Sequence, residues 1–273
     1  MKISVILITY KKFNELNLTL SALENQTKQG FEVVVAEDDD SQETKEIIKN
    51  FKKRGRLDLK HVFQKDNGYQ RSKIVNKGII ASKGDYLLFL DSDCVPRSDW
   101  VESYAKSARK GWFFSGGSVV HVPESIHSKL QSSDVKDDKI FNYQWLKDKG
   151  LSCKRTKLRL SNLGIFRHAM DFLTTRLGVF TGGNSACWKK DALSVNGFDE
   201  DFVTYGSEDR EFGARLVNFG LKGIVKKFSF IVVHLDHPRP YSDDENIKNR
   251  KIMKKVMFSR KSWAENGIRK LKQ

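Results

Sequence analysis

The sequence predicts an α/β fold in which helices flank a mostly parallel central sheet. Through the first half of the chain, short apolar runs alternate with stretches whose apolar residues recur at helical spacing. Such alternation favours a parallel sheet with right-handed crossovers. The four apolar residues Leu87–Leu90 are typical of a strand buried on both faces. The 273 residues suffice for one large domain or two small ones.

The elements of the first half follow from this pattern. Strands are predicted at residues 3–8, 31–36, 59–63 and 86–90. Apolar residues at helical spacing indicate two helices between them, at Leu16, Leu20 and Leu23 and at Ile47, Ile48 and Phe51. A third helix is predicted over residues 71–81 and leads into the last of these strands.

The pattern changes after about residue 120. Residues 121–175 are polar and weakly periodic, so we expect helices and loops that contribute a second binding surface. A short helix or turn is predicted at 189–193 and a last strand at 228–233. Another helix opens at Glu208 and ends at Gly220, with its apolar face at Phe212, Leu216 and Phe219. From Ser242 onward, a basic amphipathic helix is expected.

Charge and cysteine content limit the partners and the compartment. The formal net charge of +15 suggests a polyanionic partner, which is a nucleic acid, an anionic membrane surface or a phosphorylated substrate. Because no helix-turn-helix, zinc-finger or aromatic RNA-binding pattern occurs, no nucleic-acid partner is expected. Three scattered cysteines (Cys94, Cys153 and Cys187) fit a reducing compartment. No transmembrane segment or signal peptide is predicted, so the expected location is the cytoplasm, with a peripheral position at the inner face of the membrane as an alternative.

Polar clusters that can bind a cation follow three predicted strands. They are Glu37–Asp40, Asp91 with Asp93, and His234–His237. In open α/β sheets such strand ends can converge on one crevice, where ligands bind. The two carboxylates of Asp91 and Asp93 repel each other, and a divalent cation would remove that repulsion and hold a diphosphate. Aspartate oxygens with a ring nitrogen suit Mn²⁺ or Mg²⁺ better than a soft metal.

Glycine-rich phosphate sites are not supported. The chain contains neither Gly-x-Gly-x-x-Gly nor the P-loop pattern. The phosphates would instead be held by the metal and by basic side chains such as Arg71 and Lys73. Both residues could equally be solvated charges at the start of a helix.

Seven short motifs occur in one order along the chain. The first half carries Val5–Tyr10, the acidic segment 37–40, Asn67–Arg71 and Gly84–Asp93, and the second half carries Gly182–Asn184, Asn196–Glu200 and Tyr205–Asp209. With the first four, the chain resembles family 2 glycosyltransferases, which have the GT-A fold, a nucleotide-binding sandwich. The last three resemble the carboxyl-terminal segment shared by β-1,4-galactosyltransferases and bacterial chondroitin-type polymerases. The matches touch residues 3–95 and 180–237.

The resemblance implies roles for the donor side of the site. Thr9, Tyr10 and Asp38 would line the base pocket, with Asp38 accepting from the uracil ring. Because this chain has Glu37-Asp38-Asp39-Asp40 in place of the frequent Asp-Asp-Gly-Ser, the choice between Asp38 and Asp39 stays open. Asp91 would contact the ribose or the sugar.

The same resemblance implies the metal ligands. Asp93 would bind the cation, and His234 would complete its site, with His237 as the other candidate. Without the resemblance, a histidine at a strand end is more often an ordinary polar residue than a ligand.

On the acceptor side, Glu208 and Asp209 match the acidic pair that receives the acceptor hydroxyl, although acidic residues also favour a helix start for structural reasons. Gly183 and Asn184 join the substrate-binding set, with Asn184 toward the acceptor; Gly183 could also serve only a tight turn. Tyr205 replaces the usual tryptophan, so acceptor stacking would differ.

These roles describe an inverting transferase. Asp209 is predicted to be the general base that takes the proton from the acceptor hydroxyl. The cation would neutralise the departing nucleoside diphosphate. The expected reaction moves a hexose or N-acetylhexosamine from a UDP-sugar to a glycan or lipid-linked acceptor, by resemblance in bacterial surface polysaccharide synthesis. The alternatives are a nucleotidyltransferase, which would release pyrophosphate, and a basic nucleic-acid-binding protein.

The expected organisation is one domain with a tail. Residues 1–241 would form a GT-A glycosyltransferase domain, divided into a nucleotide-sugar-binding half (1–120) and an acceptor-binding half (121–241). Residues 242–273 would form the basic helical tail. The tail has the composition of an interfacial helix on anionic lipid, and it could also simply pack its apolar side on the domain.

Overall fold

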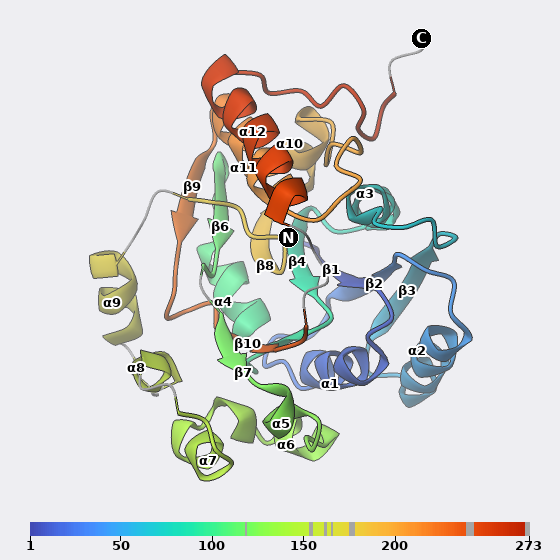
Figure 1. Ribbon diagram of the computed structural model, residues 1–273. Helices are drawn as coiled ribbons and strands as arrows, with labels where there is room; N and C mark the ends of the chain where they lie inside the picture. Colours follow the sequence, from blue (N-terminus) through green and yellow to red (C-terminus); the bar gives the residue numbers. More distant parts are fainter. Residues whose placement is uncertain are drawn as a thin grey trace.

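A computed structural model describes residues 1–117, 119–152, 155–160, 163–164, 166–174, 178–238 and 243–270. Its centre is a seven-stranded sheet with the order β3-β2-β1-β4-β8-β6-β9 (Figure 1). The strands are β1 (Ile3–Thr9), β2 (Glu32–Glu37), β3 (Asp58–Phe63), β4 (Tyr86–Asp91), β6 (Trp112–Ser115), β8 (Asn184–Trp188) and β9 (Lys222–Val225). The first four strands are mutually parallel, and β8 runs antiparallel to both of its neighbours. The predicted mostly parallel α/β sheet is confirmed.

Alternate side chains of the central strands enter two different cores. On one face, Val5 and Leu7 of β1 pack with Leu16 and Leu20 of α1 (Phe13–Glu24). This core also takes side chains from α2 (Gln42–Arg54) and α4 (Trp100–Ser107). A strand covered on both faces must be apolar at every position, which explains the continuous apolar runs of β1 and β4.

The other face of the sheet is covered by three helices. Ile6 and Ile8 of β1 pack with Ile74 of α3 (Arg71–Ala81). The same core contains side chains of α10 (Lys189–Ser194) and α11 (Glu208–Asn218). The rings of Phe198 and Phe212 stack there at 4.2 Å between centroids.

A second sheet of three strands brings the far end of the chain to the carboxyl end of β4. Its order is β5 (Cys94–Pro96), β10 (Val232–Leu235) and β7 (Val120–Val122). β10 runs antiparallel to β5 with His234 opposite Cys94, and the Leu235 N–H donates to the carbonyl of Asp93 at 2.8 Å. This pairing places His234 beside Asp93 although 141 positions separate them along the chain.

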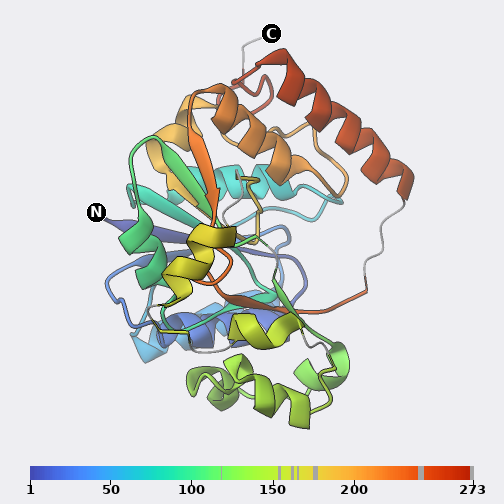
Figure 2. The same ribbon diagram turned by 90° about the vertical axis from the view of Figure 1, so that its left-hand side faces the viewer.

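The segment after residue 120 is helical, as predicted. Its described helices are short and lie at the periphery (Figure 2): α5 (Glu124–His127), α6 (Ser132–Lys136), η1 (Lys139–Phe141), α7 (Tyr143–Asp148), α8 (Arg155–Leu160) and α9 (Phe166–Thr174). Several bury one apolar side against β7 and β10, with Val135, Ile140 and Leu146 inside. Cys153 lies outside the described residues.

Several boundaries differ from the predictions. The strands β5, β6, β7, β8 and β9 were not predicted, because segments of three to five residues carry too little periodicity to be separated from loops. The predicted strand 228–233 is instead a turn followed by β10, since the Phe230 N–H donates back to the carbonyl of Lys226. Phe219 was placed on the apolar face of α11 but is 46% exposed. Gly220 follows the end of α11 at φ +103°, as a C-cap glycine should.

The basic tail is helical over α12 (Asp243–Ser259), and Ser242 and residues 271–273 lie outside the described residues. After Ser259 the chain leaves the helix and returns to the domain, where the Ile268 N–H donates to the carbonyl of Asn196. Among the described helices, none combines the length and apolar character needed to cross a bilayer.

Candidate active site

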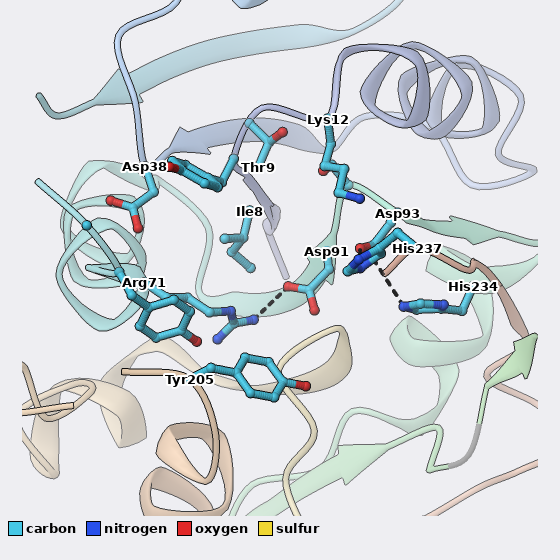
Figure 3. A pocket seen from close by; sticks show the side chains of 14 residues that line it. Ile8, Thr9, Lys12, Asp38, Arg71, Asp91, Asp93, Tyr205, His234 and His237 are labelled. Carbon is cyan, nitrogen blue, oxygen red and sulfur yellow. Dashed lines mark hydrogen bonds and ion pairs between the residues drawn. The ribbon is translucent and has the colours of Figure 1, made fainter. Parts of the chain in front are cut away.

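A cavity of about 370 Å³ opens at the carboxyl ends of β1 and β4 (Figure 3). Eight predicted site residues line it: Thr9, Tyr10, Asp38, Arg71, Asp91, Asp93, His234 and His237. The adjacent strands β1, β2 and β4 deliver the first of these because parallel strands end at one edge of the sheet. The loop between Asp91 and Asp93 is held from both sides, since the Ser92 N–H donates to Ile8 and the Ser92 carbonyl accepts from the Thr19 hydroxyl.

Asp93 lies between the two histidines. Its carboxylate oxygens are 3.1 Å from Nε2 of His237 and 3.8 Å from Nε2 of His234. Adjacent ligands around a small divalent cation are separated by roughly 3 Å when each lies at ~2.1 Å from it. Two imidazoles and one carboxylate also suit such a cation chemically. Ligand atoms of Asp93, Cys94 and His234 lie within 4.8 Å of one another and fit a divalent metal, whereas His237 contacts the other oxygen of Asp93 and is not part of that group.

The hydrogen bonds of the imidazoles point their Nε2 atoms into the cavity. Nδ1 of His237 lies 2.9 Å from the carbonyl of Pro238, which can only accept, so Nδ1 carries the proton. Nδ1 of His234 likewise lies 2.9 Å from a carboxylate oxygen of Asp236. Each Nε2 atom can therefore either carry a proton or bind a metal ion. Although burial acts against it, the hydrogen bond with His237 and the charge of His234 lower the pKa of Asp93, and the same bond raises the pKa of His237.

Asp91 belongs to a different network from Asp93. The Arg71 guanidinium donates to Asp91 at 2.6 Å and approaches Glu208 at 3.8 Å. The Tyr69 hydroxyl donates to the same Glu208 oxygen at 2.6 Å. Burial, with the neighbouring charge of Asp209, raises the pKa of Glu208, and burial raises the pKa of Asp91 in spite of Arg71. A charged network thus links the strand end of β4 to the start of α11.

Thr9 and Asp38, which were predicted to line the base pocket, both line this cavity. Asp38 is 4% exposed and accepts from the Gln64 amide at 2.6 Å and from the Gln70 N–H at 2.9 Å. Burial raises the pKa of Asp38. Asp38 lines the cavity whereas Asp39 does not. The buried Thr9 hydroxyl has no hydrogen-bond partner within the described part of the chain.

Asp209 lies at the first turn of α11, behind the cavity lining. Its carboxylate accepts from the Gly182 N–H at 3.0 Å and from the Arg210 N–H at 2.7 Å. Glu208 accepts from the Gly206 N–H at 3.0 Å in addition to the Tyr69 hydroxyl. Each carboxylate is therefore held in place by a backbone amide, and Asp209 is the less buried of the two.

Besides Glu208 and Asp209, three predicted site residues do not line the cavity. Asn184 is 1% exposed, and its amide binds the Trp100 indole, the Tyr104 hydroxyl and the carbonyl of Phe230. The prediction that it contacts substrate is therefore not supported, because its side chain faces the core. Lys73 is exposed and reaches only Gln70. Gly183 backs the cavity, and a Cβ there would lie 2.6 Å from a carboxylate oxygen of Asp91. The suggested tight turn is also present, because the Asn184 N–H donates to the carbonyl of Thr181 at 3.1 Å, so both the turn and the close approach favour a glycine here.

Two cavity residues, Tyr69 and Lys12, had no predicted role. Tyr205, which was expected to affect acceptor stacking, also lines the cavity. Lys12 points toward Asp93 and His237 in Figure 3 and forms no ion pair within the described residues. Its place in the loop after the first strand, beside the predicted Thr9 and Tyr10, was the available signal.

Comparison with known proteins gives two matches along the chain. Residues 4–190 match the profile of glycosyl transferase family 2, and residues 164–238 match a profile described as the N-terminal domain of galactosyltransferase. The chain is 31% identical over 240 residues to a chondroitin synthase of Escherichia coli, covering 80% of this chain and 32% of that protein. It is 29% identical to a hyaluronan synthase of Pasteurella multocida, covering 80% of this chain and 23% of that protein. The chain thus spans a third or less of the length of these relatives.

A solved structure agrees with the fold. GalNAc-T7 in complex with UDP, GalNAc and Mn²⁺ superposes with a TM-score of 0.61 at 14% sequence identity, covering 93% of this chain and 47% of that one. At this identity the likeness concerns the fold alone.

Proposed function

The chain belongs to glycosyl transferase family 2, has the GT-A fold and is a glycosyltransferase; from this premise we propose that it moves a hexose or N-acetylhexosamine from a UDP-sugar to a glycan or lipid-linked acceptor, with inversion and with a bound divalent cation. The observation that carries the proposal is the convergence of Asp38, Asp91, Asp93, His234 and His237 on one cavity. Residues from both halves of the chain are needed to build it.

The metal ligands of the proposal are Asp93, His234 and His237. Because each Nδ1 is bonded to an acceptor, each Nε2 is available to a metal, and both histidines are proposed as candidate ligands. Mn²⁺ or Mg²⁺ held there would neutralise charge on the leaving diphosphate. GalNAc-T7, which shares the fold, was crystallised with Mn²⁺ and UDP.

Around that position, the chain's own cations face the diphosphate. Lys12 lines the cavity without an ion pair among the described residues, and Arg71 is oriented by Asp91. Lys73 is not proposed to contact the phosphates, because its side chain is exposed to solvent and does not line the cavity. Thr9, Tyr10 and Asp38 would hold the base, with the free Thr9 hydroxyl as a further hydrogen-bonding group.

Asp209 is the proposed general base for the acceptor hydroxyl. A base must be ionised before it acts, and burial holds the pKa of Glu208 above its usual value. Glu208 also accepts from the Tyr69 hydroxyl and lies 3.8 Å from Arg71, whereas within the described residues Asp209 accepts only from the backbone amides of Gly182 and Arg210. Glu208 would therefore position Tyr69 and Arg71 while Asp209 takes the proton.

The acceptor side follows from the position of these residues. Residues 1–120 would bind the nucleotide sugar and residues 121–241 the acceptor, with 242–273 as the basic tail. A bacterial surface polysaccharide or its lipid-linked intermediate is the proposed acceptor class, since both relatives named above are polysaccharide synthases. The proposed location is the cytoplasm, with peripheral binding to the inner face of the membrane.

The test uses the purified chain with a panel of nucleotide sugars. In the presence of Mn²⁺, one UDP-sugar should raise the melting temperature and be slowly hydrolysed to UDP. Asp93→Ala should reduce this hydrolysis by at least ~10²-fold, because it removes a metal ligand and weakens donor binding. Unchanged turnover in that variant would refute the metal site, and release of pyrophosphate from a nucleoside triphosphate would identify a nucleotidyltransferase instead.

A further inference from the structure

The segment 246–264 contains seven lysines and arginines and no acidic residue. Of these cations, only Lys261 forms an ion pair with a described carboxylate, that of Glu265. The remaining six are Lys248, Arg250, Lys251, Lys254, Lys255 and Arg260. Five of them lie on α12, whose first three residues, Asp243, Asp244 and Glu245, are acidic, so the helix carries five cations against three carboxylates.

The orientation of α12 is fixed by its inner face. Asn249 is 4% exposed and donates to the carbonyls of Thr204 and Tyr205. Met253 is also buried, and near the end of the helix the Asn218 amide of α11 donates to the carbonyl of Val256. Asn249, Met253 and Val256 share one helix face, since they are spaced by four and three residues. The opposite face cannot turn toward the domain.

That opposite face combines cations with exposed apolar side chains. Along it, helical spacing of four, three and four residues joins Ile247, Lys251, Lys254 and Phe258. Lys255 lies next to them. Phe258 is 84% exposed and Ile247 is 48% exposed. Figure 2 shows α12 along the outer edge of the molecule, with α11 on its inner side. A basic helix face that also presents a phenylalanine and an isoleucine has the composition of a helix that lies in a lipid interface.

The inner side of α12 contacts a loop that lines the active-site cavity. Through Asn249, α12 is tied to Thr204 and Tyr205, and Tyr205 lines the cavity. The backbone around Gly206 also contacts α12, because a Cβ on Gly206 would lie 2.3 Å from the Asn246 amide oxygen. A surface bound by α12 would therefore come close to the acceptor side of the cavity.

We propose that the outer face of α12, formed by Ile247, Lys251, Lys254, Lys255 and Phe258, docks the protein on an anionic lipid surface and presents the cavity to acceptors held there. The cations select anionic headgroups, and Phe258 enters the boundary between headgroups and acyl chains. The proposal deepens the function proposed above by naming a partner surface, but the docking itself does not depend on sugar transfer.

The test is cosedimentation of the full chain with vesicles of phosphatidylcholine alone or mixed with phosphatidylglycerol. Binding is expected only to the anionic vesicles and should weaken with salt. Lys251→Gln/Lys254→Gln/Lys255→Gln should weaken it by roughly 100-fold, since each cation near the surface contributes about a factor of five. Phe258→Ser should weaken it by about tenfold through lost apolar burial.

The matched control removes the same charge from α2. Lys49→Gln/Lys52→Gln/Lys53→Gln alters three exposed lysines of a basic helix whose apolar residues Ile48 and Phe51 are buried. An equal loss of binding in this control would overturn the docking face in favour of general charge attraction.

Other outcomes name other occupants of the face. Unchanged vesicle binding in Phe258→Ser would overturn the insertion of Phe258 into the lipid boundary and leave attraction to the headgroups alone. A dimer in sedimentation velocity that Phe258→Ser dissolves would identify a second copy of the chain instead. UDP-sugar hydrolysis without vesicles should be the same in all these variants, so a failure of docking is distinguishable from a failure of the proposed transfer reaction.

Discussion

At the scale of single residues, Asp91 and Asp93 lie two positions apart but have opposite surroundings. Asp91 pairs with Arg71, whereas Asp93 faces the Nε2 atoms of His234 and His237. The difference arises because the intervening Ser92 is anchored to β1 and α1, which turns the two side chains to different partners. The carboxylate of Asp91 is thereby paired with the guanidinium of Arg71, and the carboxylate of Asp93 remains able to bind a metal ion.

Asp236 is expected to set the strength of the metal site without binding the metal. It accepts from Nδ1 of His234 at 2.9 Å and of His121 at 2.6 Å. Asp236→Asn keeps an acceptor oxygen but removes the charge that makes the imidazole more basic, so Mn²⁺ affinity should fall by ~10-fold or more. Electron paramagnetic resonance of free Mn²⁺ measures it directly. The exposed Asp148→Asn serves as the control, and equal affinity in both variants would contradict the role.

Asn184 is expected to matter for stability and not for substrate binding. Asn184→Ala leaves the Trp100 indole and the Phe230 carbonyl without their buried partner, while the Tyr104 hydroxyl keeps its bond to the backbone carbonyl of residue 184. The free energy of unfolding should fall by roughly 3 kcal/mol, which urea titration would measure. The KM for the UDP-sugar should be unchanged at a temperature where the variant is folded. A large rise in KM with normal stability would restore the original prediction of a substrate contact.

At the scale of elements, α11 connects the site to the core. Its first turn carries Glu208 and Asp209, and its buried side holds the ion pair of Glu211 with Arg215. Arg215 also donates to the carbonyls of Val195 and Gly197, so the helix is bonded to the turn that precedes Phe198. The position of the proposed base therefore depends on a buried guanidinium several residues away.

Removing that guanidinium should destabilise the protein strongly. Arg215→Met leaves the Glu211 carboxylate buried and unpaired, so the free energy of unfolding should fall by about 3–5 kcal/mol. Arg215→Met/Glu211→Leu removes the orphaned charge and should recover a large part of that loss. Chemical denaturation followed by tryptophan fluorescence tests both. No recovery in the double variant would show that the two carbonyl contacts, and not the ion pair, dominate.

At the scale of the whole molecule, the site is assembled by two sheets. The seven-stranded sheet supplies Asp38 and Asp91, and the three-stranded sheet brings His234 to Asp93. The pH dependence of stability also belongs to this scale, because it sums the titration of partly buried groups over the fold. Asp199, in the turn before α11, has one of the larger shifts: burial raises the pKa of Asp199 to about 6.

This shift predicts the pH at which Asp199 costs stability. The raised pKa means that the unfolded chain ionises first, so stability falls as the pH rises from 3.8 to about 6 and is constant above that. Asp199→Asn should therefore stabilise the protein at pH 7.5 by about 1–2 kcal/mol, after discounting for partial exposure, and not at pH 3.5. Thermal melts at both pH values measure this. The exposed Asp58→Asn should show no such difference, and equal stabilisation at both pH values would contradict the assignment.

The sequence alone determined the alternation that produced the parallel half of the sheet. Strands β1 to β4 and helix α3 lie close to their predicted positions because apolar periodicity is a local property of the chain. The acidic strand ends and the histidine pair were visible for the same reason, and they line the cavity. Short strands such as β5 and β7 carry no such signal, and pairing with β10 alone makes them strands.

Only the tertiary structure decided which polar residues face the cavity. Lys73 follows the cavity residue Arg71 by two positions, and Asn184 follows Gly183, which backs the cavity. The side chain of Lys73 is nevertheless exposed to solvent, and that of Asn184 is buried in the core. Lys12, Tyr69 and Tyr205 enter because distant loops meet there. The physical reason is that periodicity reports which face of an element is buried, whereas a site depends on which elements pack together and on the hydrogen bonds that orient each side chain.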